Sequence, residues 1–370
     1  MSRPKPNGIF KAILTTFPGF AALLPFWWVA KSMPEQIASA AAAKEESVRE
    51  SGFVTVNGVK LHYLDWGGSG ETMLLLTGFG DTAHVFDDFA SKFTNRFHVL
   101  GLTRRGFGES EKPKNGYDTR TRVEDIHQFL DALKIDRANI VGHSMAGDEL
   151  TLFATLYPQR VKKLVYLDAA HDRTPQAYSE YLRDPVFIQD TTDRGMRSRR
   201  MFMEVLDLPG ASEVVVKDMP PPERWAALVA TQRAMISFHA DYTKVQAPAL
   251  AFYATSTNAH YPSTWLPKDA DESLRARGDQ WWQEKGHEFS RVSAERFRKE
   301  MPHGQVIEFD DANHYVFRGK TEDEGCSANA AFLVEVIRNP PLRGGAVKNC
   351  ESNWCGRASV LASRFGYGSS

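Results

Sequence analysis

The most constraining stretch of this chain is Asn-Ile-Val-Gly-His-Ser-Met-Ala-Gly at residues 139–147. A short β-branched run ends at Gly142, and Ser144 follows in a Gly-x-Ser-x-Ala frame. A helical pattern then runs from Glu149 to Tyr157. Strand, serine and helix in this order predict a nucleophile elbow, a sharp turn that exposes one serine hydroxyl. The alternative is a chance match in an ordinary turn, which the flanking strand and helix disfavour.

A serine in such an elbow is followed along the chain by an acid and then by a histidine. Residues 305–314 read as a strand that runs into a polar loop and ends at His314. His314 is therefore the candidate base, which would take the proton of Ser144 and return it to the leaving group. The chain has 11 histidines. Another of them, His143, is expected to pack under the elbow.

Two strand ends are candidate positions for the acid. The strand at residues 248–254 is followed by Thr-Ser-Thr-Asn-Ala-His, which holds no carboxylate, and Asn258 cannot balance an imidazolium charge. The preceding strand ends at Asp168, beside the strand of the nucleophile. We therefore assign Asp168 as the acid that orients His314, and Asp172 is the second candidate for this role. A helix cap after the strand is the alternative role of Asp168.

Two backbone amides form the candidate oxyanion hole, which must direct N–H groups at the developing negative oxygen. One belongs to Met145, directly after the nucleophile. The other lies in the loop after the strand at residues 73–77, where Phe79 stands between Gly78 and Gly80. Glycines let the backbone of this loop approach a substrate closely.

The order of the remaining elements indicates an α/β protein. The sequence predicts a hairpin at 53–64 around Asn57-Gly58, buried strands at 73–77 and 97–103, and a helix at 121–133. Strands that alternate with helices predict a mostly parallel sheet covered on both faces. Such sheets bind ligands at the carboxyl ends of their strands, where Ser144, Asp168 and the Phe79 loop are expected.

These motifs resemble those of the α/β-hydrolase superfamily over roughly residues 50–340. The resemblance rests on Leu-Thr-Gly-Phe-Gly at 76–80, Arg-Arg-Gly-Phe-Gly-Glu-Ser at 104–110, Gly-His-Ser-Met-Ala-Gly at 142–147 and Asn-His-Tyr at 313–315. It implies an eight-stranded, mostly parallel sheet with an inserted helical cap, and a serine hydrolase without a cofactor. The family usually has His-Gly where this chain has Thr77-Gly78, but a hole built from backbone amides tolerates that change.

The placement of Asp168 resembles haloalkane dehalogenases, in some of which the acid follows the same strand. Those enzymes use an aspartate nucleophile, as do the epoxide hydrolases of this fold. Ser144 therefore argues against both chemistries, and the resemblance implies an esterase-like or lactonase-like activity instead.

The sequence divides into four regions. The predicted core occupies residues 50–171 and 245–340, and between them the alternation stops. Residues 172–244 form mostly helical stretches rich in Met and aromatic residues, which predict a cap over an apolar acyl or alkyl pocket. The tail at 341–370 is rich in Gly, Ser and Asn and is predicted to be disordered.

Residues 1–45 have the layout of an export signal. Arg3, Lys5 and Lys11 precede a mostly apolar stretch at 12–30, and small residues follow at 38–43. An uncleaved membrane anchor is the rival interpretation, because about 19 apolar residues can just span a bilayer. The sequence thus predicts an exported or membrane-anchored protein. A leader helix packed on a cytoplasmic domain remains the third interpretation.

Composition excludes several other classes. The 370 residues carry a formal net charge of −1 without a basic block, so nucleic acid is not an expected partner. No phosphate-binding glycine loop, zinc-protease helix motif or Cys-x-x-Cys pair occurs, so neither a cofactor nor a metal is expected. Three cysteines are too few for a disulfide framework.

Together these features predict a serine hydrolase that cleaves carboxylic esters or lactones of small to medium apolar substrates through an acyl-enzyme. The first alternative keeps the fold but changes the reaction to amide or peptide hydrolysis, C–C bond hydrolysis or a lyase reaction. The second alternative is a catalytically silent binding protein, which an intact Ser144, Asp168 and His314 disfavours.

Overall fold

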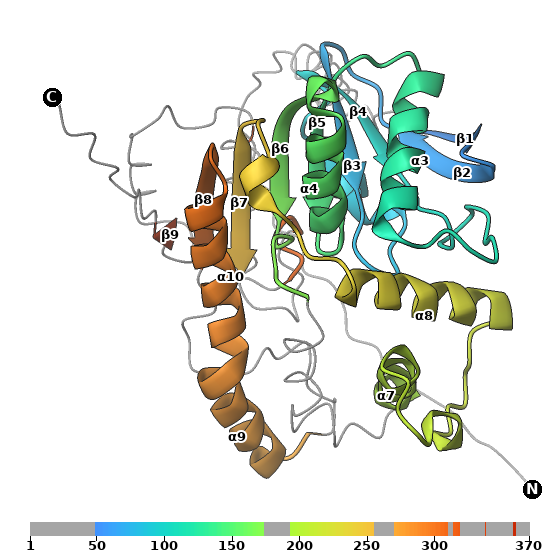
Figure 1. Ribbon diagram of the computed structural model, residues 1–370, viewed down its shortest axis with the longest axis vertical. Helices are drawn as coiled ribbons and strands as arrows, with labels where there is room; N and C mark the ends of the chain where they lie inside the picture. The colour runs from blue at the N-terminus through green and yellow to red at the C-terminus, as the bar shows by residue number, and fades with distance from the viewer. Residues whose placement is uncertain are drawn as a thin grey trace, which may run out of the picture. The chain divides into compact units, whose positions relative to one another are not determined.

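The computed structural model of this protein describes residues 49–173, 193–254, 270–309, 314–318, 337 and 358–359. They form one sheet with the strand order β1-β2-β4-β3-β5-β6-β7-β8-β9 (Figure 1). The strands are β1 (Glu50–Val56), β2 (Val59–Asp65), β3 (Glu71–Leu76), β4 (Phe97–Leu102), β5 (Ala138–His143), β6 (Val161–Leu167), β7 (Ala249–Ala254), β8 (Gly304–Phe309) and β9 (Ala358–Ser359).

The sheet is mostly parallel, as predicted. All neighbouring pairs from β4 through β3, β5, β6 and β7 to β8 are parallel. The β1–β2 hairpin adds two antiparallel strands at one edge. At the other edge β9, which contains two residues of the predicted tail, pairs antiparallel with β8. The prediction of an eight-stranded sheet with helices is confirmed, and β9 extends it.

The turn of the β1–β2 hairpin shows how the local sequence determines the pairing of these two edge strands. Asn57 and Gly58 both have positive φ angles, of 47° and 74°. Two successive residues with positive φ make the type of turn whose twist matches that of paired strands. The turn fixes the register in which Val56 faces Val59.

Helices cover both faces of the sheet. The described helices include η1 (Ala83–Phe86), α2 (Asp87–Ala90), α3 (Thr119–Ala132), α4 (Ala146–Leu156), α7 (Asp193–Val205), α8 (Pro222–Ile236), α9 (Glu272–Trp281) and α10 (His287–Glu300). Successive residues of a strand point to opposite faces. Helices α3, α4 and α10 lie on one face of the sheet (Figure 1). Leu74 and Leu76 of β3 accordingly join the core cluster that includes residues of these helices. Met73 and Leu75 join the cluster under η1 and α2.

Helices α7 and α8 lie between β6 and β7, in the region predicted as the cap. Their apolar side chains form a separate cluster that includes Val205 and Trp225 together with Phe107. Phe79 packs against the same cluster. The helical region therefore contacts the loop that follows β3.

The predicted N-terminal signal or anchor at 1–45 lies outside the described residues, as does the predicted tail apart from β9. Among the helices that the structure does describe, none is long and apolar enough to cross a bilayer.

Candidate active site

Ser144 occupies the turn between β5 and α4. Its φ angle is 54°, in the left-handed region that a serine rarely adopts. The turn is held on both sides, because the Ser144 N–H donates to the carbonyl of Leu167 at 3.2 Å and its carbonyl accepts from the Gly147 N–H at 3.0 Å. Backbone strain that is fixed in this way is typical of functional sites. The side chain of Ser144 remains partly exposed.

Close packing explains the small residues around this serine. A Cβ added at Gly142 would lie 2.5 Å from Cδ1 of Leu150, and one added at Gly147 would lie 2.0 Å from the carbonyl oxygen of Ala169. Both contacts are far shorter than van der Waals distance. The glycines therefore let α4 start directly against β5 and the end of β6.

Asp168 follows β6, also with a positive φ angle of 46°. Its Oδ2 lies 2.7 Å from Nδ1 of His314. Its backbone N–H donates to the carbonyl of Phe252 at 2.8 Å, and its Oδ1 accepts from the N–H of Ala254 at 3.0 Å. The acid and the histidine predicted from the sequence are thus in contact, and the end of β7 helps to hold the acid.

A second histidine, which sequence reasoning missed, contacts the same carboxylate. Nε2 of His171 lies 3.1 Å from Oδ1 of Asp168, and its ring stacks on Phe289 at a centroid distance of 5.1 Å. Burial alone would raise the pKa of Asp168, but the attraction and hydrogen bonds of His171 and His314 outweigh it and hold that pKa far below its ordinary value. Asp168 is therefore a carboxylate at neutral pH.

His143, which was predicted to pack under the elbow, is buried and contacts His314. Its ring packs on that of His314 at 4.5 Å, and its Nε2 donates to the carbonyl of His314 at 2.9 Å. Burial lowers the pKa of His143 well below its usual range, so the imidazole is neutral. The imidazole of His143 thus holds the backbone of His314 through a hydrogen bond and packs against its ring.

The remaining candidates are less tightly connected. Within the described residues, no hydrogen bond involves the hydroxyl of Ser144, so the link from Ser144 to His314 stays a prediction. The Asp172 N–H donates to Oγ of Ser293 at 3.4 Å. Asn258 lies outside the described residues.

The two predicted oxyanion amides are both available. Within the described part of the chain, neither the Met145 N–H nor the Phe79 N–H donates a hydrogen bond. Gly78 is required for the close approach of this loop to the elbow, because a Cβ there would lie 2.7 Å from Nδ1 of His143. The ring of Phe79 packs edge-on against Phe107 at 5.9 Å.

A buried ion cluster links the elbow to the Phe79 loop. Glu149, in the first turn of α4, accepts from Nε of Arg104 at 2.7 Å and from Nε of Arg122 at 2.6 Å. Arg104 also donates to Oγ1 of Thr77 at 2.8 Å. Burial would raise the pKa of Glu149, but the two arginines outweigh it and lower that pKa. The cluster joins α4, α3 and the end of β3 through charged hydrogen bonds.

Comparisons with known proteins agree with this fold. A family model described as the alpha/beta hydrolase fold matches residues 71–211. Epoxide hydrolase 4 of Mus musculus is 32% identical over 133 residues, which are 35% of this chain and 36% of that protein. The chain spans about a third of the length of the first curated relatives it matches.

A longer match is the cis-3-alkyl-4-alkyloxetan-2-one decarboxylase of Shewanella oneidensis, 24% identical over 73% of this chain and 84% of that protein. Among solved structures, E-2-(acetamidomethylene)succinate hydrolase aligns with a TM-score of 0.50 and 19% identity, over 79% of this chain and 98% of that one. The strand order, the helices on both faces and the structural match lead to one assignment: the chain has the alpha/beta hydrolase fold, and its residues 71–211 match the family model of that fold.

Proposed function

We propose that this protein cleaves carboxylic esters or lactones of small to medium apolar substrates through an acyl-enzyme on Ser144. The observation that carries the proposal is the 2.7 Å contact between Asp168 and His314, in a chain whose predicted nucleophile has left-handed backbone at the adjacent strand end. An acid, a base and a serine at the carboxyl ends of neighbouring strands are the groups that acyl transfer needs.

In the proposed reaction, His314 and the two oxyanion amides act once in acylation and once in deacylation. With Nδ1–H donated to Asp168, His314 presents Nε2 as the acceptor of the Ser144 proton. Oγ of Ser144 then attacks the carbonyl carbon, and the amides of Met145 and Phe79 stabilise the oxyanion. His314 returns the proton to the departing alkoxide. Water then attacks the acyl-enzyme by the same steps, and the carboxylic acid product is released.

The apolar character of the substrate is inferred from the surroundings of Phe79. Its ring contacts the cluster formed by Phe107 with residues of α7 and α8, including Trp225. A group bound at the Phe79 amide would therefore lie next to apolar side chains, which favour alkyl or acyl chains over charged groups.

A second candidate uses the same residues on a strained lactone. The relative from Shewanella oneidensis, matched over most of its length, is named as a decarboxylase of an oxetan-2-one, a four-membered lactone. Hydrolysis of such a ring adds water and gives a hydroxy acid, whereas decarboxylation gives an alkene and CO₂ without water. Product analysis with a β-lactone substrate separates the two reactions.

Covalent labelling tests the nucleophile directly. A fluorophosphonate probe should label the wild-type protein and p-nitrophenyl esters of graded chain length should be hydrolysed, while Ser144→Ala should show neither reaction. Ser91→Ala, at an exposed serine whose hydroxyl bonds the carbonyl of Asp88, is the matched control and should behave as wild type. Equal labelling of wild type and Ser144→Ala would refute the assignment.

A further inference from the structure

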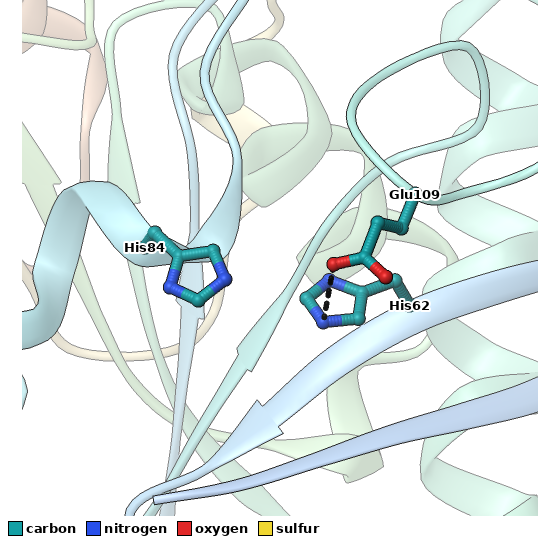
Figure 2. A group of neighbouring side chains, drawn as sticks. All are labelled: His62, His84 and Glu109. Atoms are coloured by element: carbon teal, nitrogen blue, oxygen red, sulfur yellow. Dashed lines mark ion pairs between the residues drawn. The ribbon is translucent and has the colours of Figure 1, made fainter.

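Two histidines and a glutamate from three separate elements converge outside the proposed catalytic residues. His62 lies on β2, His84 in η1 and Glu109 in the loop after β4 (Figure 2). One ligand atom from each lies within 4.8 Å of the other two. The three residues match no metal-binding sequence motif, so only the fold brings them together.

His62 is oriented to offer one ring nitrogen. The residue is 1% exposed, and its Nδ1 lies 3.0 Å from Oγ1 of Thr103. A proton on Nδ1 can be donated to that hydroxyl, which leaves the lone pair on Nε2. The hydroxyl of the exposed Ser51 lies 3.0 Å from this Nε2 and can rotate away from it.

His84 is arranged in the same way. Its Nδ1 lies 3.2 Å from Oδ2 of Asp87, whose Oδ1 accepts from Nε1 of Trp66 at 3.2 Å. Histidines that bind metals usually donate their second ring N–H to a carboxylate, which fixes the ring and raises the basicity of the other nitrogen. Asp87 therefore leaves Nε2 of His84 as the ligand atom.

Glu109 completes the group from a backbone that is held against β2. Its Oε1 lies 3.8 Å from Nε2 of His62. The next residue, Ser110, accepts from the N–H of His62 at 2.9 Å and donates to the carbonyl of Thr103 at 2.6 Å. The carboxylate is thus presented to the histidines by a fixed segment and not by a free loop.

We propose that His62, His84 and Glu109 bind a Zn²⁺ ion, with water in the remaining coordination position. Two imidazoles and a carboxylate suit Zn²⁺, whereas Mg²⁺ and Ca²⁺ prefer oxygen ligands alone. Zinc–ligand bonds of about 2.0–2.2 Å place ligand atoms about 3.3–3.5 Å apart in a tetrahedral site. The side chains of His84 and Glu109 are 41% and 63% exposed, so they can close the remaining gap.

The ion would join segments that matter to the proposed active site. His84 follows the loop that carries Phe79, and Glu109 follows Phe107, whose ring contacts Phe79. A metal bound here would cross-link these two segments to β2. We therefore expect it to stabilise the folded chain without taking part in the reaction.

Calorimetric titration of the chelator-treated full chain with ZnCl₂ tests the site, and Co²⁺ supplies visible d–d absorption as a second readout. Wild type and Ser144→Ala should each bind one equivalent, which separates this proposal from the proposed function. His84→Ala and Glu109→Gln, both at exposed side chains, should weaken binding by at least about tenfold and remove the rise in Tm caused by zinc.

His98→Ala is the matched control, because His98 is 35% exposed and also pairs with an aspartate, Asp65. It should keep wild-type affinity. The proposal is overturned if wild type binds no zinc, if His84→Ala and Glu109→Gln bind it as wild type does, or if Mg²⁺ raises Tm equally.

Discussion

At the scale of single residues, the two oxygens of Asp168 have separate partners. Oδ1 accepts from the N–H of Ala254 and lies 3.1 Å from Nε2 of His171, whereas Oδ2 faces His314. Because Oδ1 is engaged on two sides, the carboxylate cannot rotate without breaking those contacts. Its second oxygen is thereby directed at the imidazole, which is the geometry that selects one tautomer of His314.

Replacing this carboxylate tests the acid. Asp168→Asn is nearly isosteric, but it cannot balance an imidazolium and it permits the wrong tautomer of His314. We expect kcat for a p-nitrophenyl ester to fall on the order of 10⁴-fold, with KM changed much less, because the acid does not contact substrate. Asp172→Asn is the control and should keep near-normal kcat. The opposite pattern would move the acid to Asp172.

At the scale of elements, the junction of β5, β6 and α4 depends on backbone packed against backbone. The added Cβ at Gly147 would meet the carbonyl of Ala169, the residue directly after Asp168. Any shift of α4 away from this contact would move Ser144 relative to Asp168. The glycine therefore bears on both stability and activity.

Gly147→Ala should reveal this dependence. We expect a loss of roughly 1–3 kcal/mol in the free energy of unfolding, as for other overpacked sites, together with a clear fall in kcat. Gly58→Ala is the matched control, since its φ is 74° and nothing lies within 4 Å of the added Cβ. It should lose about 1–2 kcal/mol through backbone strain but keep kcat. Equal kcat in both variants would contradict the expectation.

The elements were predictable where short-range patterns determine them. The Asn57-Gly58 turn, the alternating strands and the strand–serine–helix order each follow from residues close in sequence. The contacts of Glu149 with Arg104 and Arg122 join residues 45 and 27 positions apart, and no local pattern marks them. His171 was missed for a related reason. A histidine three residues after a strand-end aspartate has no distinctive spacing, and only the loop conformation brings it back to Asp168.

At the scale of the whole molecule, the chain buries several carboxylates and arginines around the first turn of α4. Glu149 is matched by two arginines, whereas among the described residues its neighbour Asp148 forms an ion pair with Arg173 alone, whose Nη1 lies 3.2 Å from Oδ1. Oδ2 of Asp148 is buried and, within the described residues, has no hydrogen-bond partner. Ionisation of a buried carboxylate that has a partner on one oxygen only costs free energy in the folded state. This cost lowers the free energy of unfolding of the whole chain.

The stability of the whole chain should therefore depend on pH through Asp148. Burial, opposed by Arg173, raises the pKa of Asp148 to about 6, against about 3.9 for an aspartate in an unfolded chain. Because the folded pKa is the higher one, proton binding favours the folded state. That stabilising contribution is complete below about pH 4 and is lost as pH rises through about 6.

Asp148→Asn keeps a neutral side chain at every pH. The variant should match wild type in free energy of unfolding near pH 4 and exceed it by roughly 2–3 kcal/mol at pH 8, since each pKa unit corresponds to about 1.4 kcal/mol. Urea unfolding at pH 4, 6 and 8 measures the difference. Asp136→Asn, at an exposed carboxylate, controls for net charge. If Asp148→Asn were less stable than wild type at pH 8, the attraction of Arg173 would outweigh the burial of the charge, and Asp148 would belong with Glu149 among the satisfied buried carboxylates.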